Sequence, residues 1–343
     1  MSGAVLVVNA GSTSLKLSIV APDDDEVPVD SLQVAHGQVV AVGHRLVHGG
    51  AHFREPMVID DDVERRLMSL VALAPLHMHP ALDAIRQARA ALPDVSHVAA
   101  FDTAFHATIP DVAADYALPA DIRDQHGIRR YGFHGLSVQW AAQRVPVPRL
   151  VVCHLGGGCS VTAVRDGSSI DTTMGFTPLD GVPMATRSGA VDPGVLLYLL
   201  RAGMSVDELD RLLEQRSGLL GLSGESGSVK DLETSSSFAA DHALKVFEYR
   251  VATAIGAAAV ALDGLDAIVF TAGIGEHSPR VRANVCARLG TLGVRVDDAA
   301  NAAAAGHVGD AEVAASDSGV RIVVVHAREG VVIARAARTL VEN

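Results

Sequence analysis

Two stretches of the chain repeat one pattern: an apolar strand, a glycine-rich turn and a second strand. The first covers residues 4–20, and the second covers 149–164, where LVVCHL leads into GGGCS and VTAV. Apolar runs of this length, bounded by Gly and Ser, predict strands. The chain has 343 residues, which is more than one core usually fills. The repeat therefore predicts a duplicated domain, with the two copies at 1–148 and 149–330.

Helices are predicted between and after these strands. Residues 205–215 begin with a capping box, in which Ser205 and Glu208 bond each other's backbone N–H groups. Residues 239–262 are rich in Ala and apolar on most faces, which predicts a buried helix. Other elements are expected at 80–92 (helix), 267–271 (strand), 321–326 (strand) and 330–340 (helix). Alternating strands and helices indicate an α/β fold, and we expect the C-terminal helix, 331–343, to pack back on the first domain.

The composition excludes several classes of protein. The formal net charge is −12, whereas nucleic acids and acidic membranes require a positive surface. No apolar stretch reaches the ~18 to 20 residues that span a bilayer, and no basic segment precedes an apolar run at the start. Cys153, Cys159 and Cys286 lack metal-site spacing, which favours free thiols in a reducing compartment. We expect a cytoplasmic protein that binds neither nucleic acid nor membrane.

Three glycine-rich turns follow predicted strands and are candidates for binding phosphate. They are NAGSTS (9–14), GGGCS (156–160) and AGIGE (272–276). Small residues let backbone N–H groups and hydroxyls approach an anion, and Lys16 adds a positive charge near the first turn. The first turn lacks the spacing of a Walker A loop. The glycines of any one turn could serve only to reverse the chain. The three turns together predict a nucleotide held between two duplicated lobes.

Longer strings resemble the acetate and propionate kinases, which form part of a larger group with actin, sugar kinases and large heat-shock chaperones. The strings are NAGSTSLK (9–16), GHRLVHGG (43–50), APLHMHP (74–80), FDTAFH (101–106), RRYGFHGLS (129–137), HLGGGCS (154–160), DTTMGFTPLDGVPMATRSGAVDPG (171–194) and FTAGIGEHS (270–278). They cover nearly the whole chain. The resemblance implies two RNase-H-like domains with the active site between them. It also implies a homodimer that transfers the γ-phosphoryl group of ATP reversibly to acetate with Mg²⁺, or Mn²⁺, as cofactor.

The chemistry of this transfer defines what the site must supply. A carboxylate with a pKa of about 4 is already an anion at neutral pH, so the acceptor needs no general base. The site must bring two anions together and stabilise the phosphoryl oxygens, which calls for Arg, His and Mg²⁺. The resemblance implies that Arg45 and Arg187 bind the carboxylate and the transferring phosphoryl group. It implies that His134 donates a hydrogen bond or carries charge there, and that Asp102 orients an arginine or a magnesium-bound water.

The resemblance also assigns binding residues. The methyl group of acetate is expected to contact Val47, Leu76, Phe133 and Pro178, with Arg45 at the carboxylate. Mg²⁺ is expected at Asn9 and Glu329, with phosphate and water as its other ligands. The residues expected around the nucleotide are Ser12, Lys16, His154, Gly156, Gly157, Gly158, Ser228, Val229, Lys230, Gly273, Ile274, Gly275 and His277.

The chain departs from the family pattern mainly on the nucleotide side. Gly157 and His277 replace asparagines, residues 228–230 replace an Asp, an aromatic residue and an Arg, and Gly330 replaces a second acid after Glu329. These changes leave a pyrophosphate-dependent carboxylate kinase open as an alternative. A propionate or butyrate kinase also stays open, since a small pocket separates chain lengths by only ~1 to 3 kcal/mol per methylene. An alternative of another class is a nucleotide-binding regulator without transfer activity.

Overall fold

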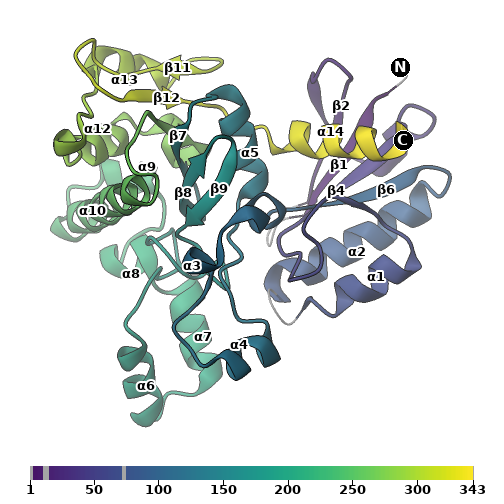
Figure 1. Ribbon diagram of the computed structural model, residues 1–343, viewed down its shortest axis with the longest axis horizontal. Coiled ribbons are helices and arrows are strands. Elements are labelled where there is room, and N and C mark those ends of the chain that lie inside the picture. The colour runs from purple at the N-terminus through teal and green to yellow at the C-terminus, as the bar shows by residue number, and fades with distance from the viewer. Residues whose placement is uncertain (1–2, 11–14, 72–74, 343) are drawn as a thin grey trace.

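The computed structural model describes residues 3–10, 15–71 and 75–342, with only the backbone of 75–77. Within these residues the chain forms two lobes, each built on a six-stranded sheet (Figure 1). Across the first sheet, the strands are β3 (Glu26–Val29), β2 (Leu15–Val20), β1 (Val5–Ala10), β4 (Ala41–Leu46), β6 (Ser96–Phe101) and β5 (Met57–Val58). Across the second, they are β11 (Ala311–Glu312), β12 (Arg321–Val324), β10 (Ala267–Thr271), β7 (Arg149–Leu155), β8 (Cys159–Arg165) and β9 (Ser168–Thr172).

The strand directions are the same in both sheets. β1 pairs antiparallel with β2 and parallel with β4, and β7 pairs in the same ways with β8 and β10. The next parallel strand, β6 or β12, carries a short antiparallel strand at its edge, β5 or β11. The predicted α/β fold with two similar domains is therefore confirmed.

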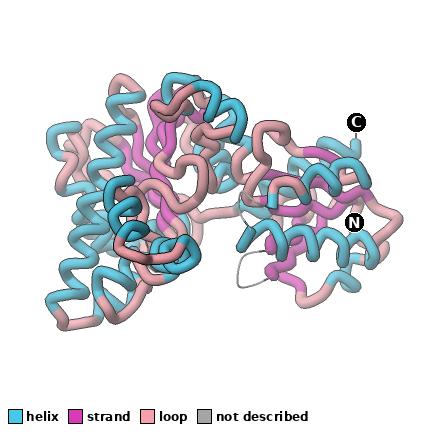
Figure 2. The backbone as a smooth tube through the Cα atoms, turned by 90° about the horizontal axis from the view of Figure 1, so that it is seen from below, coloured by secondary structure: helices cyan, strands magenta, loops and turns pink. Residues whose placement is uncertain are grey.

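Helices cover both sheets, and Figure 2 shows the strands enclosed within each lobe. Among the described residues the α-helices are α1 (Asp61–Met68), α2 (Pro75–Ala91), α3 (Asp111–Ala114), α4 (Ala120–His126), α5 (Gly135–Arg144), α6 (Pro193–Arg201), α7 (Val206–Gln215), α8 (Gly218–Ser223), α9 (Val229–Thr234), α10 (Phe238–Ala261), α11 (Ala272–His277), α12 (Pro279–Ala287), α13 (Asp298–Ala304) and α14 (Glu329–Glu342). Short 3₁₀ helices are η1 (Leu32–Ala35), η3 (Ala104–Thr108) and η4 (Gly290–Leu292). The predicted capping box of Ser205 and Glu208 is present at the start of α7.

Three apolar clusters fill the spaces between these layers. Val5 and Val7 of β1 face one cluster, whereas Leu6 and Val8 face another, because successive strand residues point to opposite faces. Helices α1 and α2 close the outer face of the first sheet, and α10 and α12 close that of the second. Helices α5 and α14 contribute to the remaining cluster, which contains strand residues from both lobes. The lobes therefore share one core.

Helix α14 crosses from the second lobe to the first. It follows β12 after a short segment, residues 325–328, and packs against β1, β4 and β6 (Figure 1). The helix lies close to β4 at Gly43, where an added methyl group would lie 2.4 Å from Ile333 Cγ2. A glycine within a strand commonly marks such a close approach of another element. The docking of α14 therefore depends on the missing side chain at position 43.

Two expectations about local structure need correction. The helix predicted at 239–262 is present as α10, but Phe238, Tyr249 and Val260 are exposed, so only one face is buried. The many alanines make the sequence look apolar on every face of the helix, although each alanine contributes little burial energy, which explains the error. The AGIGE string forms the helix α11 rather than an open turn, and Ala272 enters it with φ of 65°. In the described part of the chain, no helix is both long and apolar enough to cross a bilayer.

Candidate active site

Arg45 and Asp102 lie at the ends of two neighbouring parallel strands, β4 and β6, and form a bidentate ion pair. Arg45 Nε donates to Asp102 Oδ1 at 3.0 Å, and Arg45 Nη2 donates to Asp102 Oδ2 at 2.7 Å. The carboxyl side chain is only 1% exposed, whereas the arginine side chain is 18% exposed. The pair holds the guanidinium plane in one orientation, which suits binding of a planar or tetrahedral anion.

Asn9 and Glu329 both face the remaining terminal nitrogen of Arg45. Asn9 Oδ1 accepts from Arg45 Nη1 at 3.3 Å, and Glu329 Oε2 lies 3.6 Å from the same nitrogen. The two expected metal ligands therefore meet in one place, and both offer the oxygen atoms that Mg²⁺ prefers. The described residues include no group of three His, Cys, Asp or Glu that could hold a metal by themselves. A metal here would need phosphate and water as further ligands, the usual arrangement for Mg²⁺.

Burial and charge act in opposite directions on this cluster. Burial alone would lower the pKa of Arg45, but the charges of Asp102 and Glu329 outweigh it and raise that pKa above its ordinary value. Burial raises the pKa of Asp102, and the charge and hydrogen bonds of Arg45 oppose this rise. Arg45 is thus a fixed cation, and Asp102 is the group that holds it.

His134 and His154 form a stacked pair next to this cluster. Their ring centroids are 4.0 Å apart with an interplanar angle of 16°. His134 precedes α5 and has φ of 60°, and its Nδ1 lies 3.0 Å from Ser160 Oγ on β8. His154 lies on β7, and its Nδ1 is 2.8 Å from Ser137 Oγ on α5. Each ring is therefore oriented by a serine of another segment: Ser160 of β8 contacts His134, and Ser137 of α5 contacts His154.

Both rings are neutral at pH 7. Burial, followed by the neighbouring His154 and the charges of Arg45 and Arg187, lowers the pKa of His134 well below its ordinary value. Burial and the charge of Arg45 lower the pKa of His154 to about 4. Of the two expected roles for His134, hydrogen-bond donation fits this environment. When the Ser160 hydroxyl donates to Nδ1, the ring proton is on Nε2, which is then the donor.

Gly158 is where His134 and Arg187 come together. A methyl group placed on Gly158 would lie 3.1 Å from His134 Nε2 and 3.5 Å from Arg187 Nη2. Arg187 Nη1 donates to Pro178 O at 2.8 Å, and its Nε lies 3.7 Å from Glu214 Oε2. Because Gly158 has no side chain, His134 Nε2 and Arg187 Nη2 can both face the second glycine-rich turn.

A cavity of about 770 Å³ adjoins this turn in the second lobe. It is lined by residues of α9, α11, the turn after β7 and other loops: Gly156, Gly157, Ala185, Gly227, Ser228, Val229, Lys230, Glu233, Gly273, Ile274, His277, Ser278 and Ala305. Eight of these were expected around a nucleotide: Gly156, Gly157, Ser228, Val229, Lys230, Gly273, Ile274 and His277. The cavity walls therefore contain Gly157, residues 228–230 and His277, in which the chain departs from the family pattern, but not Gly330.

The other expected nucleotide residues lie elsewhere. His154 and Gly158 belong to the histidine and arginine cluster, and Gly275 is buried within α11. Lys16 is exposed on β2, opposite Asn9 in the strand register. Ser12, and the side chain of Leu76, lie outside the described residues.

The three remaining residues expected around the acetate methyl group are buried. Val47 and Phe133 belong to one apolar cluster, and Pro178 is buried near the Arg187 contact. His48 packs edge-on against Phe133 and Tyr131, with centroid distances of 5.4 and 4.7 Å. Burial lowers the pKa of His48 to about 4, so this ring also packs as a neutral group. The sequence analysis did not assign His48 a role.

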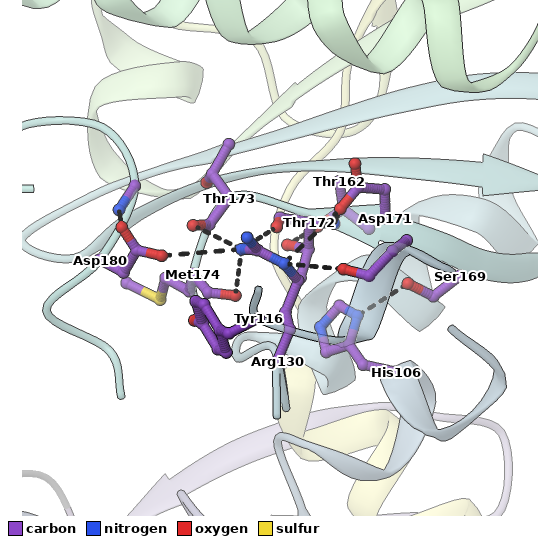
Figure 3. A network of polar contacts seen from close by, with 12 residues as sticks. His106, Tyr116, Arg130, Thr162, Ser169, Asp171, Thr172, Thr173, Met174 and Asp180 are labelled. Atoms are coloured by element: carbon purple, nitrogen blue, oxygen red, sulfur yellow. Dashed lines mark hydrogen bonds and ion pairs between the residues drawn. The ribbon is translucent and has the colours of Figure 1, made fainter. Parts of the chain in front are cut away.

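Arg130, which lies shortly before Phe133 in the chain, bonds the end of β9 and the residues that lead toward Pro178 (Figure 3). Its Nη1 donates to the carbonyl oxygens of Thr172, Thr173 and Met174 at 2.8, 3.2 and 3.3 Å. In the same network His106 Nε2 lies 2.9 Å from Phe133 O, and its Nδ1 lies 2.8 Å from Ser169 Oγ. The guanidinium therefore fixes the separation of the two segments.

A sequence model of the acetokinase family matches residues 27–335. The chain belongs to the acetokinase family. Among its relatives, the acetate kinase of Synechococcus sp. (strain JA-2-3B'a(2-13)) is 46% identical over 324 residues, which cover 91% of this chain and 79% of the relative. The expected family resemblance is confirmed by both comparisons.

Solved structures of an acetate kinase and of a propionate kinase have the same fold. A propionate kinase from Francisella tularensis subsp. tularensis SCHU S4 gives a TM-score of 0.89 at 32% identity, covering 98% of this chain and 99% of that one. The Porphyromonas gingivalis acetate kinase gives a TM-score of 0.87 at 30% identity, covering 99% and 100%. The similarity includes both lobes, so the whole two-domain arrangement is shared.

Sequence reasoning missed the residues that orient the site. Ser137, Ser160, Arg130 and Glu214 hold the histidines and arginines through contacts between distant segments. Ser137 and Ser160 lie inside strings that resemble the family, and Ser160 was considered only as part of a phosphate-binding turn. A search for hydroxyl residues near each functional histidine in the paired strands and helix would have identified both serines.

Proposed function

We propose that this chain is an acetate kinase, which transfers the γ-phosphoryl group of ATP to acetate to give acetyl phosphate and ADP, and catalyses the reverse reaction. The observation that carries the proposal is the position of the glycine-rich turn at 156–158. Its first two residues line the 770 Å³ cavity, and its third faces His134 Nε2 and Arg187 Nη2. A nucleotide in the cavity would thus direct its phosphates at these donors. Membership of the acetokinase family supports the same reaction.

Each side chain has a role that follows from its fixed partners. Asp102 accepts from Arg45 Nε and Nη2, and Asn9 accepts from Nη1, which leaves a second N–H group on each terminal nitrogen to contact substrate. The Pro178 carbonyl holds Arg187 Nη1, while Nη2 faces the phosphate side. The neutral His134 donates a hydrogen bond between the two arginines. Three donors in a partly buried site stabilise charge on the equatorial phosphoryl oxygens without any proton transfer from acetate.

Asn9 and Glu329 are the proposed metal ligands, together with phosphate oxygens and water. A bound Mg²⁺ supplies charge neutralisation at the phosphates. Without it, the Glu329 carboxylate lies 3.6 Å from Arg45 Nη1, so Glu329 balances the arginine charge. We expect activity to require a divalent cation, with Mn²⁺ able to replace Mg²⁺ because it accepts the same oxygen ligands.

Acetate is the proposed acceptor and ATP the proposed donor, with alternatives that the same assay separates. One solved structure of similar fold is a propionate kinase, so propionate and butyrate are the competing acceptors. The substitutions at Ser228, Val229 and Lys230 line the nucleotide cavity, which keeps pyrophosphate as a competing donor. A regulator that only binds nucleotide has no evident need for the Arg45, His134 and Arg187 arrangement.

The test is an assay in which acyl phosphate is trapped as its hydroxamate. Acetate, propionate and butyrate are each supplied with ATP or pyrophosphate, with and without Mg²⁺. We expect acetyl hydroxamate with ATP and Mg²⁺ at the highest rate. Arg187→Ala should lose transfer while it keeps nucleotide binding. If wild-type protein binds nucleotide but forms no acyl phosphate with any donor, the regulator replaces the kinase.

We also propose that the chain forms a homodimer through α6 and α7. Helix α6 has no buried residue, and its Val195, Leu197 and Tyr198 are 45%, 50% and 68% exposed. Exposed apolar side chains gathered on one helix are typical of a protein interface. Light scattering should give the mass of a dimer for the wild type and of a monomer for Leu197→Glu. A monomeric wild type at micromolar concentration would contradict this.

The remaining assignments are proposals of the same kind. We propose that the protein works in the cytoplasm, where ATP is available and where the unpaired thiols of Cys153, Cys159 and Cys286 would stay reduced. Small molecules are its proposed binding partners, without nucleic acid or membrane. We also propose that the domains divide at 148/149 and 330/331, with residues 331–343 assigned to the first domain.

A further inference from the structure

Glu276 is buried where the nucleotide cavity meets the segment that crosses between the lobes. It lies in α11, and its side chain is 10% exposed. The crossing segment is residues 325–328, between β12 and α14. Sequence analysis placed Glu276 in a glycine-rich turn and assigned it no function. Its contacts show that it has partners in two separate segments.

One carboxylate holds three donors. Glu276 Oε1 accepts from the backbone N–H groups of Ala272, at 2.8 Å, and Ala327, at 3.0 Å. Glu276 Oε2 lies 2.7 Å from His326 Nδ1. Ala272 begins α11, whereas His326 and Ala327 belong to the crossing segment. The three contacts together link the start of α11 to the crossing segment.

The first segment forms part of the nucleotide site. Gly273 and Ile274 line the cavity directly after Ala272. Ala272 itself has φ of 65°, which is unfavourable for a residue with a side chain. Its Cβ would lie 3.5 Å from a methyl group placed on Gly156 in the second glycine-rich turn. The bond from Glu276 to Ala272 therefore supports a strained backbone at the point where two glycine-rich strings meet.

The second segment leads to the acceptor side. Glu329, two residues after Ala327, lies 3.6 Å from Arg45 Nη1. Trp140 on α5 donates from Nε1 to His326 O at 2.8 Å, which ties the segment to the helix that follows His134. His326 Nε2 also lies 2.9 Å from His307 O. Both ring nitrogens of His326 thus face oxygen acceptors, one on Glu276 and one on the backbone of His307.

We infer that Glu276 is a positioning residue that couples the nucleotide site to Glu329 and Arg45 through the lobe-crossing segment. The inference rests on the proposed function and goes beyond it, because Glu276 is not itself among the residues that line the cavity or that contact the acceptor in that proposal. Both carboxylate oxygens are occupied by protein donors, so Glu276 acts through Ala272 and Ala327. Removal of the Glu276 carboxylate is therefore expected to displace both the start of α11, beside the nucleotide cavity, and the segment that leads to Glu329.

Two variants of Glu276 separate geometry from charge. Glu276→Ala removes all three contacts. Glu276→Gln keeps an oxygen for Ala272 and Ala327, and its amide group can donate to His326 Nδ1 when the ring proton is on Nε2. We expect Glu276→Ala to lower kcat roughly tenfold and to raise both the KM for ATP and the half-saturating Mg²⁺ concentration roughly threefold or more. Glu276→Gln should stay within about twofold of wild type because its hydrogen bonds remain.

Glu248→Ala is the matched control. Glu248 is a carboxylate of the same lobe, 1% exposed, and it bonds Asn284 Nδ2 at 2.9 Å away from the cavity. This variant should lose stability without any change in Mg²⁺ dependence. Kinetic values for Glu276→Ala within twofold of wild type would overturn the inference. So would a Glu276→Gln variant as impaired as Glu276→Ala, since charge rather than position would then matter.

Hydrogen exchange on the wild type tests the coupling without any catalysis. MgADP binding in the cavity should slow exchange at the Ala327 amide and its neighbours, in addition to residues 272–277. Slowing at 272–277 alone would overturn the inference, even if the alanine variant fails to fold. A wild type that transfers no phosphoryl group would overturn only the proposed function, because the exchange result stands independently.

Discussion

Arg45 shows how one side chain receives its role from partners that the sequence places far away. The sequence identified Arg45 and Asp102 through strings that resemble a known family. It could not show that the two form a bidentate pair, because β4 and β6 become neighbours only when the sheet forms. The same applies to the two serines, since Ser160 and Ser137 meet the stacked histidines across segments. Residue types were thus predictable, and orientations were not.

The ion pair predicts the effect of Asp102→Asn. An amide cannot accept both hydrogen bonds as an anion does, so Arg45 is released toward Glu329. We expect kcat to fall roughly 100-fold, the size of effect seen when one electrostatic contact in a site is lost. Steady-state kinetics of the folded variant measure this. Asp266→Asn is the control, because Asp266 forms a similar pair with Arg149 outside the site. Equal losses in both variants would contradict the prediction.

Buried histidines predict acid sensitivity. The histidines with a lowered pKa are His44, His48, His97, His106, His134 and His154, and burial is the largest cause in each. A lowered pKa means that the unfolded chain binds more protons as pH falls below 6.5. Stability is therefore full above pH 6.5 and is lost toward pH 4, with a slope of about 1.4 kcal/mol per pH unit for each histidine.

Urea denaturation at pH 7.5, 6.5 and 5.5 measures this slope. For each histidine, the free energy of unfolding should fall about three times as much between pH 6.5 and 5.5 as between pH 7.5 and 6.5. In His106→Gln, which removes one titrating ring, the slope below pH 6.5 should decrease by about 1.4 kcal/mol per pH unit. An unchanged slope in that variant would show that the ring of His106 does not titrate on unfolding.

At the level of elements, patterns with strong local signals were predicted well. The alternating strands, the antiparallel pairs β1–β2 and β7–β8, and the capping box of α7 are all present. The errors arose where local signals were ambiguous. An alanine-rich helix reads as apolar on all faces, and the AGIGE string contains glycines that indicate a turn. Glu276 instead caps the start of α11 from within the helix, which sequence alone does not show.

Substitution of Arg130 tests how far the end of β9 and the segment before His134 are held together by one guanidinium group. Arg130→Met would leave the carbonyl oxygens of Thr172, Thr173 and Met174 without their donor. We expect a loss on the order of 3 kcal/mol in unfolding free energy. The KM for acetate should rise as Phe133 and Pro178 separate. Calorimetry and kinetics measure the two effects. Arg165→Met, which removes one exposed hydrogen bond to Ala261, should change neither by a comparable amount.

At the level of the whole molecule, the duplicated fold was predictable because each copy of the strand–turn–strand repeat is a continuous stretch of the sequence. The shared core between the lobes was not, since α5 and α14 fill it from positions far apart in the chain. Gly43 illustrates the difference. Nothing in the sequence around Gly43 distinguishes it from an ordinary strand glycine, but the docked helix leaves no space for a side chain there.

Gly43→Ala is therefore expected to destabilise the junction of the lobes. The added methyl group would lie 2.4 Å from Ile333 Cγ2, so β4 and α14 must separate. Overpacking of this kind costs about 1–3 kcal/mol. Thermal unfolding should show a lower midpoint, and limited proteolysis should cut the 325–328 segment faster than in wild type. Gly157→Ala, where an added methyl group meets nothing within 4 Å, should leave both measurements unchanged.

The position of α14 also sets an order of events during synthesis. Strands β1 to β6 leave the ribosome first, but the helix that covers one face of their sheet is made only after the entire second sheet. Domains generally fold as they emerge, at about 5–20 residues per second. The first lobe must therefore wait, with Val5, Val7 and Val98 uncovered, until the second lobe has been translated. The nascent first lobe is thus expected to be a client of ribosome-associated chaperones, whereas the second lobe can complete its own sheet as it is made.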